Sequence, residues 1–332
     1  MQSATARPSA KQVAVDLVAL TKPRITFMVV LTGLGGYWLA LRYFALDVDP
    51  SRMVAFLAAT ALIVSGANAL NMFIERDSDA HMARTRNRPL PTRRLSPDTA
   101  LRLGVLLSAI SVPWLAFGVT PMTGLLGAIA LGSYVLLYTP MKRKSPIALL
   151  VGCVPGALPP LMGWSAARGS VDGPGLILFG IMFLWQVPHF LAIATFRKDE
   201  YARAGLRVLP VVRGDRVTRH HVVRYLAALL LMSLLLVPYG IGGTIYLIAA
   251  LGLGAWFFVV GALGLRKTAG ALWARRLFFV SMFYLMGLFA ALTAGTALSG
   301  SSEVAPAEEA SMDVSSSPGA ISSPSTHELA AR

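Results

Sequence analysis

Cysteine and charged side chains are scarce in this sequence, and each scarcity excludes a class of protein. Cys153 is the only cysteine in 332 residues, so an intrachain disulfide and a thiolate metal cluster are both excluded. Only 14% of the residues are charged, whereas 55% are hydrophobic, and the mean hydropathy is +0.62. A water-soluble domain has no means of burying so much apolar surface. The composition therefore predicts an integral membrane protein.

Nine apolar stretches are long enough to cross a bilayer as helices. They cover residues 25–45, 53–74, 99–118, 121–138, 147–166, 174–195, 222–240, 244–264 and 277–298. We therefore expect an all-α polytopic membrane protein, with a bundle of nine transmembrane helices around a central cavity in residues 23–298. Residues 1–22 are expected to form a cytoplasmic tail whose second half is a candidate interfacial helix, and residues 299–332 a disordered C-terminal tail.

The basic residues indicate how the bundle is oriented. Among the 30 Lys and Arg residues, all but Arg42, Arg52, Arg168 and Arg332 fall in the N-terminal tail or in and beside the long links on one side of the membrane. The positive-inside rule then places the N-terminus and these links in the cytoplasm and the C-terminus outside, most simply in a bacterial inner membrane. Because the charges are dispersed between apolar spans, the net charge of +14 does not indicate nucleic acid binding. It suits an anionic substrate or the headgroups of membrane lipid.

The strongest chemical signal follows the second span. Asn71, Glu75 and Asp79 are four residues apart, so on a helix that continues out of the span they form one stripe that drifts by about 40° per step. Such oxygen donors suit Mg²⁺, which takes few protein ligands and completes its shell with water and phosphate oxygens. Arg84 and Arg88 follow with the same spacing and can clamp a diphosphate. These residues predict a magnesium and diphosphate site that stabilises a departing pyrophosphate.

The alternative reading of this motif is that its acids only neutralise the surrounding arginines at a membrane surface. The acids begin on the apolar span itself, however, and charged groups at membrane depth are costly enough to favour a functional role. Asp77 points away from the stripe and is a weaker candidate.

A second polar cluster follows the sixth span. Gln186 and His189 lie within the apolar run, and Asp199, Glu200 and Tyr201 come a few turns later. We predict substrate contacts for these residues, with Asp199 as a further metal ligand. The alternatives are a solvated helix end for the two acids and, for His189, a hydrogen bond to a neighbouring helix.

The fourth and fifth spans add two further expectations. Tyr138, Lys142 and Arg143 end the fourth span on the predicted inner face, where they either contact substrate or anchor the helix at the interface. The fifth span holds three prolines within residues 155–160, which predicts an irregular or broken helix. Such a helix is tolerated only where it is buried in protein or lines a cavity.

These motifs together resemble the UbiA-type intramembrane prenyltransferases, and within them the branch that farnesylates heme. The resemblance covers residues 20–298 and rests on the segments LTKPRIT at 20–26, RDSDAHMARTRNRPLP after Glu75, LYTPMKRKSP at 137–146, GALPPLMGW at 156–164 and WQVPHF at 185–190 followed by KDEYARAG. Lys22 and Arg24 of the first segment are added to the expected substrate-binding residues on this ground. The adjacent Asp199 and Glu200 depart from the spaced aspartates of quinone-type relatives.

The resemblance implies a substrate pair and a mechanism. Farnesyl diphosphate is expected to bind through Mg²⁺ to Asn71, Glu75 and Asp79, and heme B to act as the acceptor and become heme O. His189 is expected to hold the heme by its iron or by a propionate. A heme O oxygenase or a terminal oxidase is a candidate partner. The rival readings are a quinone-pathway aromatic prenyltransferase and, from another class, a non-catalytic membrane transporter or assembly factor.

Overall fold

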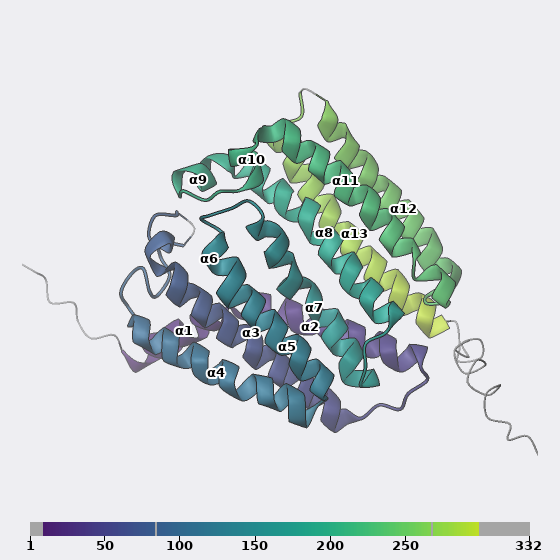
Figure 1. The fold of residues 1–332 in the computed structure, drawn as a ribbon, viewed down its shortest axis with the longest axis horizontal. Coiled ribbons are helices and arrows are strands. Elements are labelled where there is room, and N and C mark those ends of the chain that lie inside the picture. The colour runs from purple at the N-terminus through teal and green to yellow at the C-terminus, as the bar shows by residue number, and fades with distance from the viewer. Residues whose placement is uncertain (1–8, 84, 267, 299–332) are drawn as a thin grey trace, which may run out of the picture.

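The computed structural model describes residues 9–83, 85–266 and 268–298, and within these ranges all regular secondary structure is helical (Figure 1). The α-helices are α1 (Ala10–Thr21), α2 (Pro23–Tyr43), α3 (Pro50–Asp79), α4 (Pro97–Gly118), α5 (Pro121–Gly132), α6 (Thr139–Met141), α7 (Ala148–Arg168), α8 (Gly173–Phe196), α9 (Lys198–Arg203), α10 (Leu209–Val212), α11 (Gly214–Leu234), α12 (Gly243–Ala262) and α13 (Ala271–Leu298). Three short elements complete the described chain, namely η1 (Ser133–Tyr138), η2 (Val237–Tyr239) and η3 (Leu263–Leu265).

In the described part of the chain, nine helical segments are long and apolar enough to span a membrane, which confirms the predicted all-α bundle. They are Pro23–Tyr43, Pro50–Asp79, Pro97–Gly118, Pro121–Met141, Ala148–Arg168, Gly173–Phe196, Gly214–Tyr239, Gly243–Leu265 and Ala271–Leu298. Two of them extend well beyond the apolar stretch. The second runs without a break for 30 residues to Asp79, and the seventh begins at Gly214, within a basic segment. Hydropathy marks where polarity begins, whereas the helix continues until its hydrogen bonding ends.

Several spans begin with the same local signal. Asp49, Ser96 and Thr120 each precede a proline at the first helical position, and each side chain accepts a hydrogen bond from the backbone N–H three residues later. The side chain satisfies a donor that would otherwise lack a partner, and proline costs nothing where no intrahelical bond is made. These caps explain the sharp starts of α3, α4 and α5.

The first seven helices and the last group of helices form neighbouring parts of one bundle (Figure 1). α2 lies against α7, where Gly36 faces the carbonyl of Pro160 and Gly163 faces the carbonyl of Gly33 with no room for a Cβ atom. α8 packs on α11 and α13, and α13 also packs on α12. Trp164 of α7 and Tyr284 of α13 are fully buried in the shared core. Close backbone approach through small residues is the usual means of helix association in a membrane.

The fifth span was predicted to be an irregular or broken helix. α7 is a single helix through all three of its prolines, so the broken form of that prediction was wrong. The proline-rich face is covered by the glycines of α2, and this tight packing supports the helix where hydrogen bonds are lost. The fourth span instead contains the π-helix η1 between α5 and α6. Such wide turns are rare and often occur at functional sites.

The N-terminal helix expected at residues 11–22 is present as α1. Leu20 packs with Met72 of α3 and with Leu90 and Leu95 of the following loop. The side chain of Asp16 is bound by Arg94 at 3.0 Å. α1 is therefore fixed to the segment that follows the predicted site. The disordered tail predicted for residues 299–332 lies outside the described residues.

Candidate active site

The predicted stripe of oxygen donors is present on the last turns of α3. Asn71 and Asp79 are almost fully buried, and the Glu75 side chain is 17% exposed. Asp77, between the last two, has a side chain that is 81% exposed and points elsewhere. The four-residue spacing thus separates buried from exposed acids as the sequence predicted.

Each member of the stripe is bound by a cation from a different segment. Lys22 Nζ donates to Asn71 Oδ1 at 3.0 Å, and Lys142 Nζ donates to Glu75 Oε1 at 2.8 Å. In the loop after α3, Arg88 Nη1 donates to Asp79 Oδ2 at 2.6 Å. Lys22 stands at the junction of α1 and α2 with φ of 48°, a left-handed conformation that is costly for a residue with a side chain. The fold thus brings four separate segments together around one stripe.

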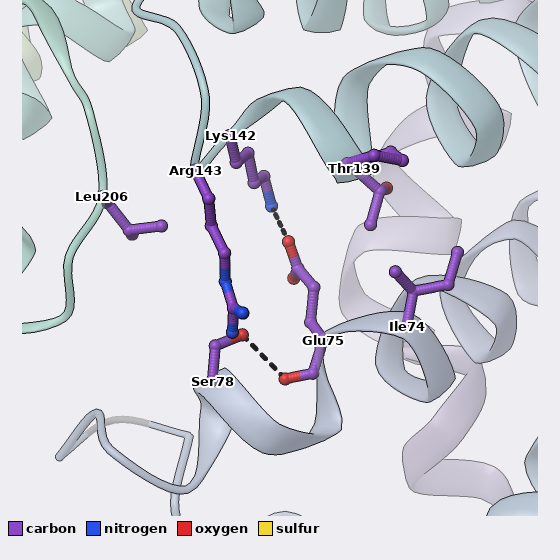
Figure 2. A pocket seen from close by; sticks show the side chains of 8 residues that line it. Ile74, Glu75, Ser78, Thr139, Lys142, Arg143 and Leu206 are labelled. Atoms are coloured by element: carbon purple, nitrogen blue, oxygen red, sulfur yellow. Dashed lines mark hydrogen bonds and ion pairs between the residues drawn. The ribbon is translucent and has the colours of Figure 1, made fainter.

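A cavity of about 210 Å³ opens beside this stripe (Figure 2). Ile74, Glu75, Ser78, Thr139, Pro140, Lys142, Arg143 and Leu206 line it. Arg143 runs alongside Glu75 toward Ser78 in Figure 2, and within residues 9–83, 85–266 and 268–298 no carboxylate pairs with it. The sequence identified Glu75, Lys142 and Arg143 but missed the uncharged part of the wall.

Thr139 is a site residue that the sequence did not reveal. Its hydroxyl accepts a hydrogen bond from Asn71 Nδ2 at 3.3 Å and donates one to the carbonyl of Tyr134 at 2.8 Å. The π-helix η1 ends directly before it and also carries Tyr138, whose ring lies 4.6 Å from Lys142 Nζ. No pattern in the sequence distinguishes a π-helical turn from an α-helical one, so this contact was invisible before the structure.

The site is electropositive, and its cations affect one another. Burial, together with the charges of Arg88 and Lys142, lowers the pKa of Lys22 to about 7. Burial also acts to lower the pKa of Lys142, but Tyr138 and Glu75 outweigh it and raise that pKa above its usual value. Lys142 is therefore a permanent cation, whereas Lys22 faces a neutral carboxamide and changes charge near neutral pH.

The donor set fits a hard divalent cation. Asn71, Glu75 and Asp79 offer only oxygen atoms, which suits Mg²⁺ and excludes a thiolate-type metal site. In the described residues no three His, Cys, Asp or Glu side chains come together as metal ligands. Arg84, predicted to clamp the diphosphate, lies outside the described residues.

The second polar cluster does not join this donor set. Asp199 of α9 is exposed, Glu200 binds Arg197 at 2.9 Å, and Lys198 binds Asp215 at 2.9 Å. The segment reaches the cavity through Leu206, next to Arg207, whose backbone N–H bonds to the carbonyl of Lys142 at 3.4 Å. Tyr201 is half-buried on α9, and Arg24 is exposed at the start of α2.

Gln186 and His189 of α8 both bond to neighbouring helices. Gln186 Nε2 donates to the carbonyls of Cys153 on α7 and Met182 on α8, at 3.2 and 3.0 Å. His189 Nδ1 lies 2.7 Å from Ser281 Oγ on α13. The structure thus shows for His189 the interhelical hydrogen bond that was the alternative to substrate contact. The imidazole ring is half-buried, and this hydrogen bond uses only Nδ1, not Nε2.

Comparison with known proteins agrees with this geometry. Residues 29–287 match the UbiA prenyltransferase family. The chain belongs to this family. It is 56% identical over 279 residues to a protoheme IX farnesyltransferase of Sorangium cellulosum, an alignment that covers 81% of this chain and 100% of the relative.

Solved structures show the same fold at low sequence identity. A digeranylgeranylglyceryl phosphate synthase superimposes with a TM-score of 0.75 at 17% identity, covering 85% of this chain and 98% of that one. A UbiA homolog from Archaeoglobus fulgidus, bound to DMAPP and Mg²⁺, gives a TM-score of 0.59 at 14% identity, covering 84% and 99%. The nine-span bundle is therefore the fold of intramembrane prenyltransferases.

Proposed function

We propose that this protein transfers the farnesyl group of farnesyl diphosphate to a vinyl group of heme B and so produces heme O. The observation that carries the proposal is the stripe of Asn71, Glu75 and Asp79 beside a basic cavity at the end of an apolar bundle. The choice of acceptor is supported by the high identity to a protein named protoheme IX farnesyltransferase over that protein's whole length.

The diphosphate end of the substrate is recognised by charge. Asn71, Glu75 and Asp79 would hold Mg²⁺, and Asp199 stays a weaker candidate because it is exposed and apart from the stripe. When bound, Mg²⁺ neutralises the diphosphate and stabilises the departing pyrophosphate. Arg143 lines the cavity and pairs with no carboxylate in the part of the chain that the structure describes, so it is the group best able to take the first phosphate contact.

Lys142 and Arg88 have a double role in this proposal. Each neutralises one acid of the stripe before substrate arrives, at 2.8 and 2.6 Å, so the buried acids are never left unpaired. Lys142 also lines the cavity, and both groups are charged donors able to bind phosphate oxygens. Lys22 adds a third donor next to Asn71. These cations stabilise the negative charge that grows on the leaving group.

The covalent steps balance with water as the only other reactant. The bond between farnesyl C1 and the diphosphate oxygen breaks, and its electron pair leaves with pyrophosphate. The vinyl π electrons of heme B form the new carbon–carbon bond, which leaves a cation on the vinyl carbon next to the porphyrin ring. Water adds there and loses a proton, giving a hydroxyethylfarnesyl side chain. The apolar walls of the bundle protect the allylic cation from early capture by water.

The charge distribution supports a location for this chemistry. We place the protein in a bacterial inner membrane, with the N-terminus, α3 end and basic links in the cytoplasm and the C-terminus outside, because nearly all Lys and Arg residues lie on one side. Membrane lipid then surrounds the apolar spans. An enzyme that consumes heme O, such as a heme O oxygenase or a terminal oxidase, is the expected recipient of the product.

A direct product assay tests the function. The purified full chain is incubated with heme B, farnesyl diphosphate and Mg²⁺, and the porphyrin is analysed by mass spectrometry. The expected product gains the mass of one farnesyl group and one hydroxyl group. Asp79→Asn should give far less product, and Asp77→Asn, a matched control on the exposed side of α3, should give the wild-type amount. An unmodified porphyrin, together with prenylation of 4-hydroxybenzoate, would replace this proposal with the quinone-pathway alternative.

A further inference from the structure

His189 is held by a hydrogen-bond chain that runs from α8 to α13. Its Nδ1 lies 2.7 Å from Ser281 Oγ, and Ser281 Oγ lies 2.6 Å from the carbonyl oxygen of Phe278. The backbone of Ser281 is fixed as well, because its carbonyl accepts a hydrogen bond from Trp185 Nε1 at 2.7 Å. Ser281 is fully buried, so these contacts are the ones its hydroxyl makes.

The chain determines which nitrogen of His189 carries the proton. Two oxygen atoms 2.6 Å apart need a hydrogen between them, and the carbonyl of Phe278 has none to give. The single hydroxyl hydrogen of Ser281 is therefore used on that carbonyl. Ser281 Oγ can only accept from His189, so Nδ1 is the protonated nitrogen. In the neutral imidazole, Nε2 is left with an unprotonated lone pair.

Aromatic rings fix the plane of this imidazole. Trp185 stacks on it with ring centres 4.7 Å apart, and Phe278 lies 4.8 Å away in a tilted arrangement. Phe190 meets it edge to face at 5.5 Å and is itself 39% exposed. A ring with one nitrogen anchored and its faces packed presents the other nitrogen in a defined direction.

We propose that His189 coordinates the iron of the heme substrate through Nε2, with Ser281 as the positioning residue that keeps this nitrogen unprotonated. The inference rests on the proposed function, because heme B is the acceptor there. It decides between the two heme contacts open to a histidine. A propionate needs a hydrogen-bond donor, which Nε2 in this tautomer is not, whereas ferric or ferrous iron needs a lone pair. Metal-bound histidines commonly have their second nitrogen fixed in this way by an oxygen acceptor.

Coordination of the iron gives the acceptor a fixed point inside an otherwise apolar bundle. An iron held at Nε2 would fix the centre of the macrocycle relative to α8. A vinyl group has no polar atom that the protein could bind. Its position would therefore be set by the coordination of the iron.

Absorbance titration of the purified full chain with ferric heme B tests the assignment without any turnover. The wild type should show the Soret shift of imidazole-ligated iron. His189→Ala should abolish that signature, and Ser281→Ala should weaken heme affinity about tenfold, the usual scale for losing a partner that orients a metal ligand. Ser281→Thr keeps the hydroxyl and should stay near wild type. His220→Ala is the matched control, because His220 is exposed on α11 and bonds through Nδ1 to a backbone carbonyl.

Two further measurements separate the outcomes. In His189→Gly, added imidazole should restore the ligated spectrum, which excludes misfolding as the cause of its loss. Metal-free protoporphyrin IX should bind His189→Ala as well as it binds wild type; weaker binding of this iron-free ring would show a propionate contact and overturn the assignment. If wild type makes heme O while its heme spectrum is unchanged by His189→Ala, this inference fails alone. If the spectrum depends on His189 but no porphyrin is farnesylated, the proposed function fails alone.

Discussion

The polar clusters at the ends of α3 and α8 have similar compositions but are built in opposite ways. At the end of α3, lysines bind side chains that are 49 and 67 residues away in sequence. At the end of α8, Arg197 binds Glu200 and Lys198 binds Asp215, which are only 3 and 17 residues apart. The first arrangement requires the whole bundle to assemble, whereas the second forms within one local segment.

Burial differs in the same direction. The Asp79 side chain is 4% exposed and Asp215 is 40% exposed. Exposed local ion pairs contribute little to stability or specificity, because solvent screens them and the long side chains lose entropy when fixed. Buried charges gathered from distant segments are costly to maintain. Asp79 itself pairs with Arg88 only nine residues away, so burial is what separates this acid from the exposed acids of the second cluster.

The largest expected effect comes from comparing acids across the two clusters. Asp79→Asn should lower kcat/KM on the order of 100-fold or more, because it removes the buried carboxylate that we propose holds Mg²⁺ at the leaving group. Asp199→Asn should change it by less than about twofold, as expected for an exposed surface acid. Steady-state rates of heme O formation measure both, with thermal melting to confirm folding. An equal loss of kcat/KM in the two variants would show that α9 moves into the site during turnover. The two clusters would then not differ in function.

A smaller effect on KM is expected from a change of pH, and it arises only in the cluster at the end of α3. The pKa of Lys22 is lowered to about 7 in the free protein, and an arriving diphosphate favours its charged form, so binding takes up a proton. The gain in affinity from this charge is fully present below pH 7 and is lost as pH rises above it, by up to about tenfold per pH unit. KM for farnesyl diphosphate should rise accordingly between pH 7 and 8.5.

The variant Lys22→Arg sharpens this test. Its guanidinium stays charged, so the rise of KM above pH 7 should disappear. The KM of this variant below pH 7 should stay close to that of the wild type. A pH profile identical in wild type and Lys22→Arg would assign the titration to another group.

The smallest expected effect concerns stability. Asp16 is buried against the exposed end of Arg94, whose hydrogen bond lowers the pKa of that carboxyl from its ordinary 3.8. The pair therefore stabilises the docked α1 above pH 3.8, and the contribution is lost as pH falls below it. Asp16→Asn should lower Tm by about 2 °C at pH 7 and by less at pH 3.5. Asp215→Asn, which removes an exposed pair of the second cluster, should leave Tm unchanged.

The sequence was sufficient for features that depend on local periodicity. Nine spans, the helical continuation to Asp79 and a helix in the N-terminal segment were all predicted from apolar runs and residue spacing, and the family from its motifs. It was not sufficient for features that depend on partners from distant segments. The π-helix before Thr139, the continuity of α7 through its prolines and the bond between His189 and Ser281 each involve an interaction between helices that no local pattern encodes.

The unbroken length of α3 has a consequence for how an amphipathic substrate is sorted. Thirty residues at 1.5 Å each make a rod of about 45 Å, while the hydrocarbon layer is about 30 Å thick. With Pro50 at one surface of the hydrocarbon layer and α3 along the membrane normal, Asn71 would stand near the opposite surface, and Asp79 about 12 Å farther along the helix. The isoprenoid chain of a substrate can then stay in the hydrocarbon layer while its diphosphate binds outside that layer. The length of one rigid helix thus separates the two ends of the substrate without a conformational change.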